Sequence, residues 1–173
     1  MQKHPWKSLN KLKGELGLIE EDFVNGLLFT SITNWCPYTK STLNAMIVVD
    51  LKQGCYLELC EWNSLLLNEK IFLDSDRNLV YYFFRGGKVL VYDALNNHEQ
   101  LTEFNCGVNL VNKVALEGTD LKIWGRHNMN QLNRNQVEIT CSEVWKPVIE
   151  SLEMRLPSDL VRKIIRHVPM YVL

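Results

Sequence analysis

The sequence lacks the features that mark membrane and secreted proteins. No apolar run reaches the roughly 18 residues that a membrane-spanning helix needs. Residues 1–14 have no apolar centre of the kind found in a secretory signal. The five cysteines are scattered, and an odd number without tight spacing favours reduced thiols over a disulfide framework. These absences predict a protein of the cytoplasm or the nucleus, with no membrane partner.

The chain also lacks an excess of basic residues. Nineteen Lys and Arg stand against twenty Asp and Glu, which gives a formal net charge of −1. Proteins that bind nucleic acids usually carry a basic excess or a basic stripe, because they must neutralise phosphates. We therefore expect no nucleic-acid partner.

Motifs of catalysis and metal binding are missing as well. No Gly-x-Ser-x-Gly, P-loop or dinucleotide fingerprint occurs. The four histidines stand far from the cysteines, and Cys55 and Cys60 have no second pair at zinc-finger spacing. Asp74 and Asp76 are spaced like the start of a calcium loop, but a strand follows directly, so we predict a turn. We predict no catalytic residue, no metal and no cofactor; a thiol-dependent or hydrolytic enzyme with a pocket assembled by the fold is the alternative.

What the chain does contain is a strong β pattern, centred on residues 69–95. Leu79–Phe84 is one leucine followed by five β-branched or aromatic residues, and Val89–Tyr92 repeats that chemistry. Gly86 and Gly87 between them supply the positive φ of a tight hairpin turn. Both faces of the first strand are apolar, which predicts a strand inside a sheet that is covered on both sides. The residues that we expect in the core are Tyr81, Phe83, Val89 and Val91.

The rest of the chain is predicted to be mainly β with a helix at each end. The predicted strands are Gly26–Ile32, Met46–Asp50, Cys55–Trp62, Gln100–Phe104, Val111–Leu116, Leu121–Trp124 and Val137–Thr140. Apolar residues at helical spacing from Trp6 to Ile19 predict an amphipathic N-terminal helix. The asparagine-rich run His127–Gln136 predicts a loop. We expect a β-rich domain over residues 1–145, including the N-terminal helix, and a helical appendage over residues 146–173.

A faint internal repeat bears on the arrangement of the strands. Met46–Leu51 resembles Val89–Ala94, 43 residues further on, and Asn78–Tyr82 resembles Asp120–Trp124, 42 residues further on. Periods of about 40–45 residues are typical of β-propeller blades. Any two strand–turn–strand units look alike, however, so a compact antiparallel sandwich or barrel of seven to nine strands is the other interpretation. The fold class is therefore an antiparallel sandwich, a barrel or a set of propeller-like sheets.

The C-terminal segment carries the one functional motif. In Leu156–Pro169, LPSDLVRKIIRHVP, Pro157 stands where a proline is tolerated in a first helical turn, and Pro169 ends the pattern. The string resembles the opening of an F-box, the short helical module that docks ubiquitin-ligase substrate receptors onto a cullin adaptor. It is also similar to the looser patterns of the cullin box and the elongin-binding box. The resemblance covers 14 of 173 residues.

We therefore predict a non-enzymatic protein-interaction module. The resemblance implies a ubiquitin-ligase substrate-receptor-like subunit that contacts a protein partner, such as a cullin-ligase adaptor, through its C-terminal helix. A structural subunit of a larger assembly is the alternative among binding proteins, and a helix that only packs on the β core is the alternative for the segment. The predicted partner-binding residues are Leu156, Pro157, Leu160, Val161, Ile164, Ile165 and Val168.

Overall fold

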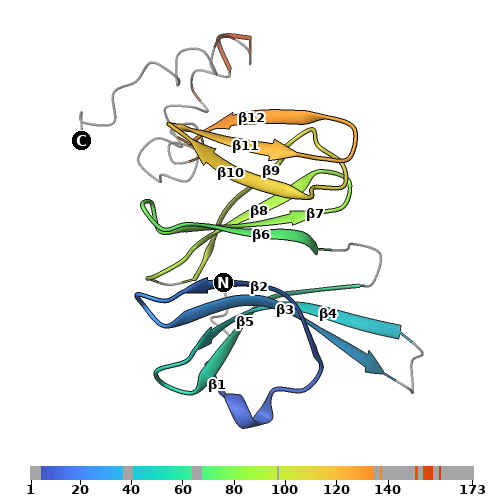
Figure 1. Cartoon of the computed structure of the whole chain (residues 1–173), viewed down its shortest axis with the longest axis vertical. Helices are drawn as coiled ribbons and strands as arrows, with labels where there is room; N and C mark the ends of the chain where they lie inside the picture. The colour runs from blue at the N-terminus through green and yellow to red at the C-terminus, as the bar shows by residue number, and fades with distance from the viewer. Residues whose placement is uncertain are drawn as a thin grey trace.

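The computed structural model describes residues 5–36, 41–63, 68–96, 98–134, 137, 151, 154–157 and 160. Over these residues the chain folds into three antiparallel sheets, which lie face to face in a stack (Figure 1). The first sheet has the strand order β1-β5-β4-β3-β2, the middle sheet β6-β7-β8-β9, and the third sheet β10-β11-β12. The prediction of a mainly β fold is confirmed. The sheets stay open, and no barrel closes within the described part of the chain.

The strand bounds follow the predicted ranges closely in the centre of the chain. The first sheet consists of β1 (Lys7–Ser8), β2 (Glu15–Asp22), β3 (Leu27–Cys36), β4 (Ser41–Asp50) and β5 (Cys55–Asn63). The middle sheet consists of β6 (Asn68–Asp74), β7 (Leu79–Phe84), β8 (Lys88–Asp93) and β9 (Gln100–Asn105). The third sheet consists of β10 (Lys113–Glu117), β11 (Asp120–Trp124) and β12 (Met129–Asn133).

The middle sheet is covered on both faces, as the apolar pattern of Leu79–Phe84 predicts. All six residues of β7 are buried. Because side chains alternate along a strand, Val80, Tyr82 and Phe84 enter the core shared with the first sheet. Leu79, Tyr81 and Phe83 enter the core shared with the third sheet. The four residues that we expected in the core, Tyr81, Phe83, Val89 and Val91, are completely buried.

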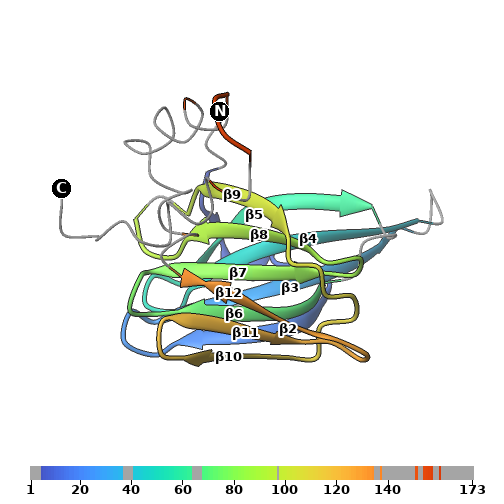
Figure 2. The ribbon, with the colours of Figure 1, turned by 90° about the horizontal axis from the view of Figure 1, so that it is seen from above.

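The faint sequence repeat corresponds to equivalent strands of successive sheets. β4 and β8 are each the third strand of a four-stranded meander, and β7 and β11 are each the second strand of their sheet. Seen from above, the three sheets overlap one another (Figure 2), and β6 contacts both β2 and β10. Asp50 and Asp93 end β4 and β8 with the same turn. In each, Oδ1 accepts the backbone N–H groups two and three residues further on, at 2.9 Å.

The predicted N-terminal helix is wrong. Its first part forms a single 3-10 turn, η1 (Leu9–Lys11), and its second part is the strand β2. Gly14 adopts a φ of +117°, and Gly17 lies so close to β3 that a Cβ would collide with Ser31. Glycine is a poor helix former, and here both glycines are used for close pairing with β3. Leu9 and Leu12 pack on the outer face of the first sheet, and this contact accounts for part of the apolar spacing.

The predicted loop over His127–Gln136 is wrong where it contains β12. This strand pairs with β11. Asparagine is tolerated in it because the asparagine side chains form hydrogen bonds to other groups and leave the backbone hydrogen bonds of the strand pair intact. Asn130 Nδ2 donates to the Cys106 carbonyl, and Asn133 Nδ2 donates to Asp120 Oδ1 at 2.9 Å. The predicted domain boundary at residue 145 lies outside the described residues, and so do most of Val137–Thr140 and most of the predicted helical appendage over residues 146–173.

A buried ion pair joins the third sheet to the middle sheet. Arg134, directly after β12, donates from Nε to Asp74 Oδ2 at 2.7 Å, and its Nη2 bonds Asp74 Oδ1. The Asp74 side chain is 0% exposed and that of Arg134 9%. Asp76 adds a longer contact of 3.3 Å to Nη2. We call the pair the Asp74–Arg134 clamp. The two aspartates lie in the turn that their spacing predicted. A hydrogen bond from the Arg77 backbone N–H to the Asp74 carbonyl, at 3.2 Å, closes this turn.

Candidate functional site: a cleft at one end of the first two sheets

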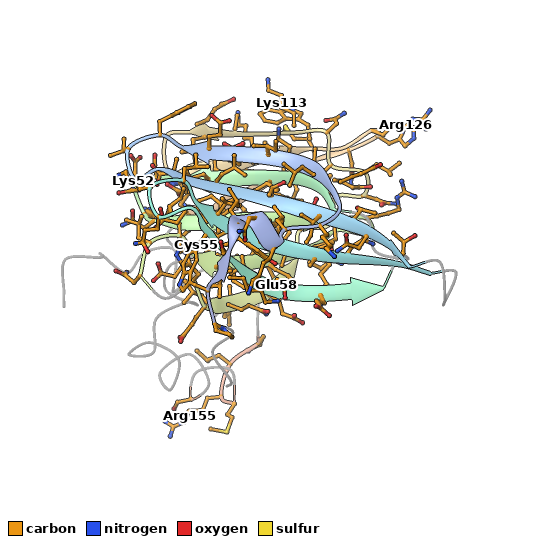
Figure 3. The ribbon with its side chains drawn as sticks, turned by 90° about the horizontal axis from the view of Figure 1, so that it is seen from below. Lys52, Cys55, Glu58, Lys113, Arg126 and Arg155 are labelled. Atoms are coloured by element: carbon orange, nitrogen blue, oxygen red, sulfur yellow. The ribbon has the colours of Figure 1, made fainter. Side chains whose placement is uncertain are left out.

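The ends of the first and middle sheets border a cleft of about 660 Å³. It is lined by the N-terminal segment, the β2–β3 and β4–β5 turns, strand β5 and the β8–β9 loop. Figure 3, which looks along the stack, shows Lys52 of the β4–β5 turn at one side of the molecule and Arg126 at the opposite side. The lining residues are Pro5, Trp6, Asn25, Leu27, Asp50, Gln53, Leu57, Glu58, Leu59, Cys60, Tyr92, Leu95, Asn96, His98, Glu99 and Gln100. Small-molecule sites have volumes in this range.

Aspartates fix the turns that form the rim of the cleft. Besides Asp50 and Asp93, Asp22 at the end of β2 accepts the Asn25 backbone N–H at 3.1 Å. Such side-chain caps are the reason why Asp and Asn favour turns. Burial alone would raise the pKa of Asp93, but the N–H groups of Asn96 and Leu95 hold that pKa below its ordinary value. The rim is therefore built from turns with defined hydrogen bonds.

Apolar side chains stand out from the same turns into solvent. Phe23 is 86% exposed and Val24 85%, and Leu51 on the neighbouring turn is also exposed. The two turns contact each other, because the Leu51 N–H donates to the Gly26 carbonyl at 2.9 Å and Lys52 Nζ donates to the Val24 carbonyl at 3.2 Å. The same ends of the strands thus carry both a cleft and exposed apolar residues. We call Phe23, Val24 and Leu51 the apolar rim.

His98 is the most unusual residue of the cleft. It has a φ of +51° and is only 9% exposed, between the rings of Trp6 and Phe29 at centroid distances of 5.6 and 6.5 Å. Burial lowers its pKa, although Asp93 and Asp50 act in the opposite direction, so the ring is neutral at pH 7. Nδ1 of the ring is buried and has no hydrogen-bond partner among the described residues.

The charged residues that line the cleft are all acidic. Asp50, Glu58 and Glu99 are among the lining residues, and no Lys or Arg is. Glu58 is bonded to Lys7 Nζ at 2.6 Å, and this hydrogen bond raises the pKa of Lys7. Asp50 holds the β4–β5 turn through one oxygen.

The thiol and the phenol in the cleft are not activated for nucleophilic chemistry. Burial raises the pKa of Cys60, and its Sγ lies 3.8 Å from the Glu61 carbonyl. Burial likewise raises the pKa of Tyr92, whose hydroxyl donates to Gln100 Oε1 at 3.3 Å. Reactive cysteines have lowered pKa values, because the thiolate is the nucleophile.

No group of three His, Cys, Asp or Glu side chains is placed to hold a metal ion anywhere in the described ranges. Over the same ranges, no helix is long and apolar enough to cross a membrane.

Of the partner-binding residues predicted from the sequence, three are described, and none of these three lines the cleft. Leu156 is half-buried, Pro157 is exposed, and Leu160 is 46% exposed. The Leu160 N–H donates to the Pro157 carbonyl at 2.9 Å. The remaining four predicted residues, Val161, Ile164, Ile165 and Val168, fall outside the described residues.

Sequence reasoning did not find the cleft. It treated His98 as an isolated histidine and did not single out Trp6, Asp50 or Asn25. One signal was present in the chain, because Asp50 and Asp93 stand at matching places in the two repeats. That match predicts two similar turns, but only the stacking of the sheets brings the turns together.

Comparison with known proteins adds no further assignment: no protein-family model matches the chain, and no curated protein matches its sequence.

Proposed function

We propose that this protein is a non-enzymatic protein-interaction module, which binds a segment of a partner at the cleft and the apolar rim. The observation that carries the proposal is the exposure of Phe23 and Val24 on turns next to a cleft. Exposed apolar side chains beside a polar-lined depression are typical of binding surfaces. The stacked sheets supply a rigid support, and loops on rigid scaffolds often carry function.

We further propose that the C-terminal segment contacts a second protein, such as a cullin-ligase adaptor. The protein would then be a substrate-receptor-like subunit of a ubiquitin ligase, in the cytoplasm or the nucleus. The resemblance of Leu156–Pro169 to an F-box or a cullin box supports this. The exposure of Leu160 and of Met154, which is 82% exposed, also supports it, because a docking segment must leave apolar surface uncovered.

A structural subunit, with a propeller completed by another chain, is less well supported. The three sheets resemble consecutive propeller blades in their strand order. The outer side of the third sheet, however, carries a Lys122–Glu117 ion pair, and Lys113 Nζ lies 4.8 Å from the Trp124 ring centroid. A further sheet stacked there would have to desolvate these charges, which is unfavourable. We therefore favour a three-sheet body as the binding unit.

Photo-crosslinking in cells that produce the full chain tests the partner site. Phe23 is replaced by p-benzoylphenylalanine, which keeps the aromatic ring, and the matched control carries the same amino acid at Met129, an exposed residue of the third sheet. We expect discrete crosslinked species from position 23 that position 129 does not give, and we expect Val24→Asp to weaken them. Identical products from both positions, or none from position 23, would contradict the proposal.

The C-terminal contact needs a separate test. Leu160→Asp combined with Ile164→Asp should abolish adaptor binding in a pull-down with the purified adaptor and leave the melting temperature unchanged. A helix that only packs on the core would instead lose stability, because two charges would be buried. A collapsed melting temperature, or adaptor binding that survives the double change, would refute a docking role.

A further inference from the structure

We propose that the open edge of β2 pairs with an extended segment of a partner protein, in which apolar residues alternate with Lys or Arg. This surface goes beyond the proposed partner site, because no residue of β2 lines the cleft. Three features of the strand carry the inference: its place at the end of a sheet, its exposed apolar side chains and its excess of acidic residues.

β2 offers backbone groups for a further strand. It is the last strand of the first sheet, on the opposite side from β5, and among the described strands it pairs with β3 alone (Figure 2). In an antiparallel pair, every second residue turns its N–H and C=O groups away from the neighbouring strand. The eight residues of β2 therefore present a row of donors and acceptors, which is a template for strand addition.

Three large apolar side chains of β2 are exposed. Leu16 is 51% exposed, Ile19 47% and Leu18 36%. The other strands that end a sheet expose at most one such side chain each among the described residues, Leu116 on β10 and Met129 on β12. Native proteins often protect an edge with Lys or Pro, and β2 contains neither. Its edge thus keeps apolar surface that a partner strand can cover.

A bulge determines which part of the edge pairs best. The register between β2 and β3 shifts between Leu16 and Ile19 and is unbroken from Ile19 to Asp22. Bulges bend a strand and increase its twist, which hinders pairing across them. We therefore place the partner segment along Ile19–Asp22, with Leu16 and Leu18 beside its end.

The charges of β2 select the partner. The strand has no Lys or Arg and has four acidic residues, Glu15, Glu20, Glu21 and Asp22. Glu15 and Glu21 are exposed, and no described residue forms an ion pair with either of them. Opposite charges on paired strands are favourable, whereas like charges directly opposite each other are unfavourable. A basic segment therefore matches β2, and a second copy of β2 would place carboxylates beside carboxylates.

The two faces of β2 explain why apolar and basic residues should alternate in the partner. Ile19 pairs with Thr30 and lies on the outer face of the first sheet, whereas Glu20 pairs with Phe29, whose side chain points to the middle sheet. Burial raises the pKa of Glu20, although Lys70 of β6 acts in the opposite direction. An alternating segment can place its apolar side chains beside Ile19 and its cations beside Glu20.

Isothermal titration of the full chain with three matched peptides tests the pairing and the charge. The probe is acetyl-Lys-Val-Lys-Val-Lys-Val-amide. One control carries N-methyl groups on the two central residues, which removes one N–H from each edge of the peptide and keeps its side chains. The other control has Glu in place of each Lys. We expect the probe to bind about 10-fold more tightly than either control.

Each peptide can refute one part of the proposal. Equal binding of the N-methylated peptide would overturn strand pairing, and equal binding of the glutamate peptide would overturn the selection by charge. A probe that does not bind would overturn both.

Variants locate the binding on β2. Ile19→Lys places a charge of the partner's sign on an exposed position, and we expect about 10-fold weaker binding at an unchanged melting temperature. Glu21→Gln removes one exposed charge and should weaken binding about 3-fold. The control Leu116→Lys makes the same change as Ile19→Lys on the edge strand β10 and should leave the affinity unchanged. Full affinity in both β2 variants, or an equal loss in the control, would overturn the proposal.

Hydrogen exchange read by mass spectrometry distinguishes this surface from the cleft. Pairing with an added strand protects backbone amides that otherwise exchange with solvent. We expect the probe to slow exchange in Glu15–Asp22 and to leave Cys55–Asn63, the strand that borders the cleft, unchanged. Protection confined to Cys55–Asn63 would overturn β2 as the site and leave the proposed function standing.

Sedimentation of the chain alone tests the other occupant of the edge, a second copy of this protein. We expect a monomer, because the acidic residues of two β2 strands would repel each other. A dimer in which the β2 amides are protected from exchange would assign the edge to self-association and overturn the partner segment as its occupant.

Discussion

Replacing Arg134 with Met should destabilise the protein by about 3–5 kcal/mol, which is the typical cost of removing one member of a buried ion pair. Asp74 is 0% exposed, and both of its oxygens bond Arg134. The variant would leave the carboxylate without its cation and without access to water. Methionine fills much of the arginine volume, so the loss reports the charge rather than a large cavity.

A second variant separates the charge from the packing. In Asp74→Asn/Arg134→Met the buried group is a neutral amide, which costs less to desolvate than a carboxylate. We therefore expect the double variant to be more stable than Arg134→Met alone, although one more native group has been changed. A double variant that is more stable than the single variant indicates that Arg134→Met leaves a buried charge without a partner.

Urea unfolding followed by tryptophan fluorescence gives the free energies of unfolding. The matched control is Lys88→Met, because Lys88 pairs with Glu103 at 3.1 Å with the two side chains 44% and 56% exposed. An exposed pair of this kind contributes about 0–1 kcal/mol. Hydrogen exchange should show that Arg134→Met loses protection in β10–β12 before β2–β5. If Arg134→Met costs no more than Lys88→Met, the clamp does not hold the third sheet.

Three further predictions follow from the core, the central turn and the thiols. Phe83→Ala should lower the free energy of unfolding by about 3–5 kcal/mol, because the ring is fully buried; a loss below about 1 kcal/mol would contradict the two-sided core. Gly87→Ala should cost more than Gly86→Ala in the same assay, since both have positive φ but only a Cβ at Gly87 meets Asn105 Oδ1, at 2.8 Å; equal costs would refute the steric argument. Thiol titration of denatured protein without reductant should find all five cysteines. Iodoacetamide at pH 8 should alkylate Cys60 of the native protein more slowly than it alkylates glutathione, because burial raises the pKa of Cys60. A smaller thiol count would indicate disulfides, and rapid modification of Cys60 would favour a thiol enzyme.

The central strands could be predicted because their signal is local. Leu79–Phe84 and Val89–Tyr92 carry their β preference in every residue, and the two glycines fix the turn, so β7 and β8 have nearly the predicted bounds. The N-terminal segment was misread because its apolar spacing fits a helix by itself. The strand β2 forms because β3 offers a pairing edge along Glu15–Asp22. That edge is a tertiary feature, which no window of the sequence contains.

The cleft could not be predicted for a related reason. Asp50 and His98 are 48 positions apart in the chain, and the sheet stack alone places them in one lining. The buried state of His98, which decides its chemistry, depends on Trp6 and Phe29 from two other segments. The C-terminal motif presents the opposite case. Its pattern is easier to recognise in the sequence than the residues of the cleft, and its role as a docking segment stays a prediction.

The stacking order has a consequence for synthesis on the ribosome. The first sheet is translated before β6–β8, so its inner side chains, among them Phe29, Met46 and Val48, are uncovered until Tyr82 and Phe84 leave the exit tunnel. At that stage a nascent chain exposes half of a core, which chaperones bind and which promotes association between neighbouring chains. A variant that slows the arrival of the middle sheet, or weakens its apolar face, should therefore reduce the soluble yield more than its effect on the finished fold would suggest. Quality control would act on this protein midway through translation.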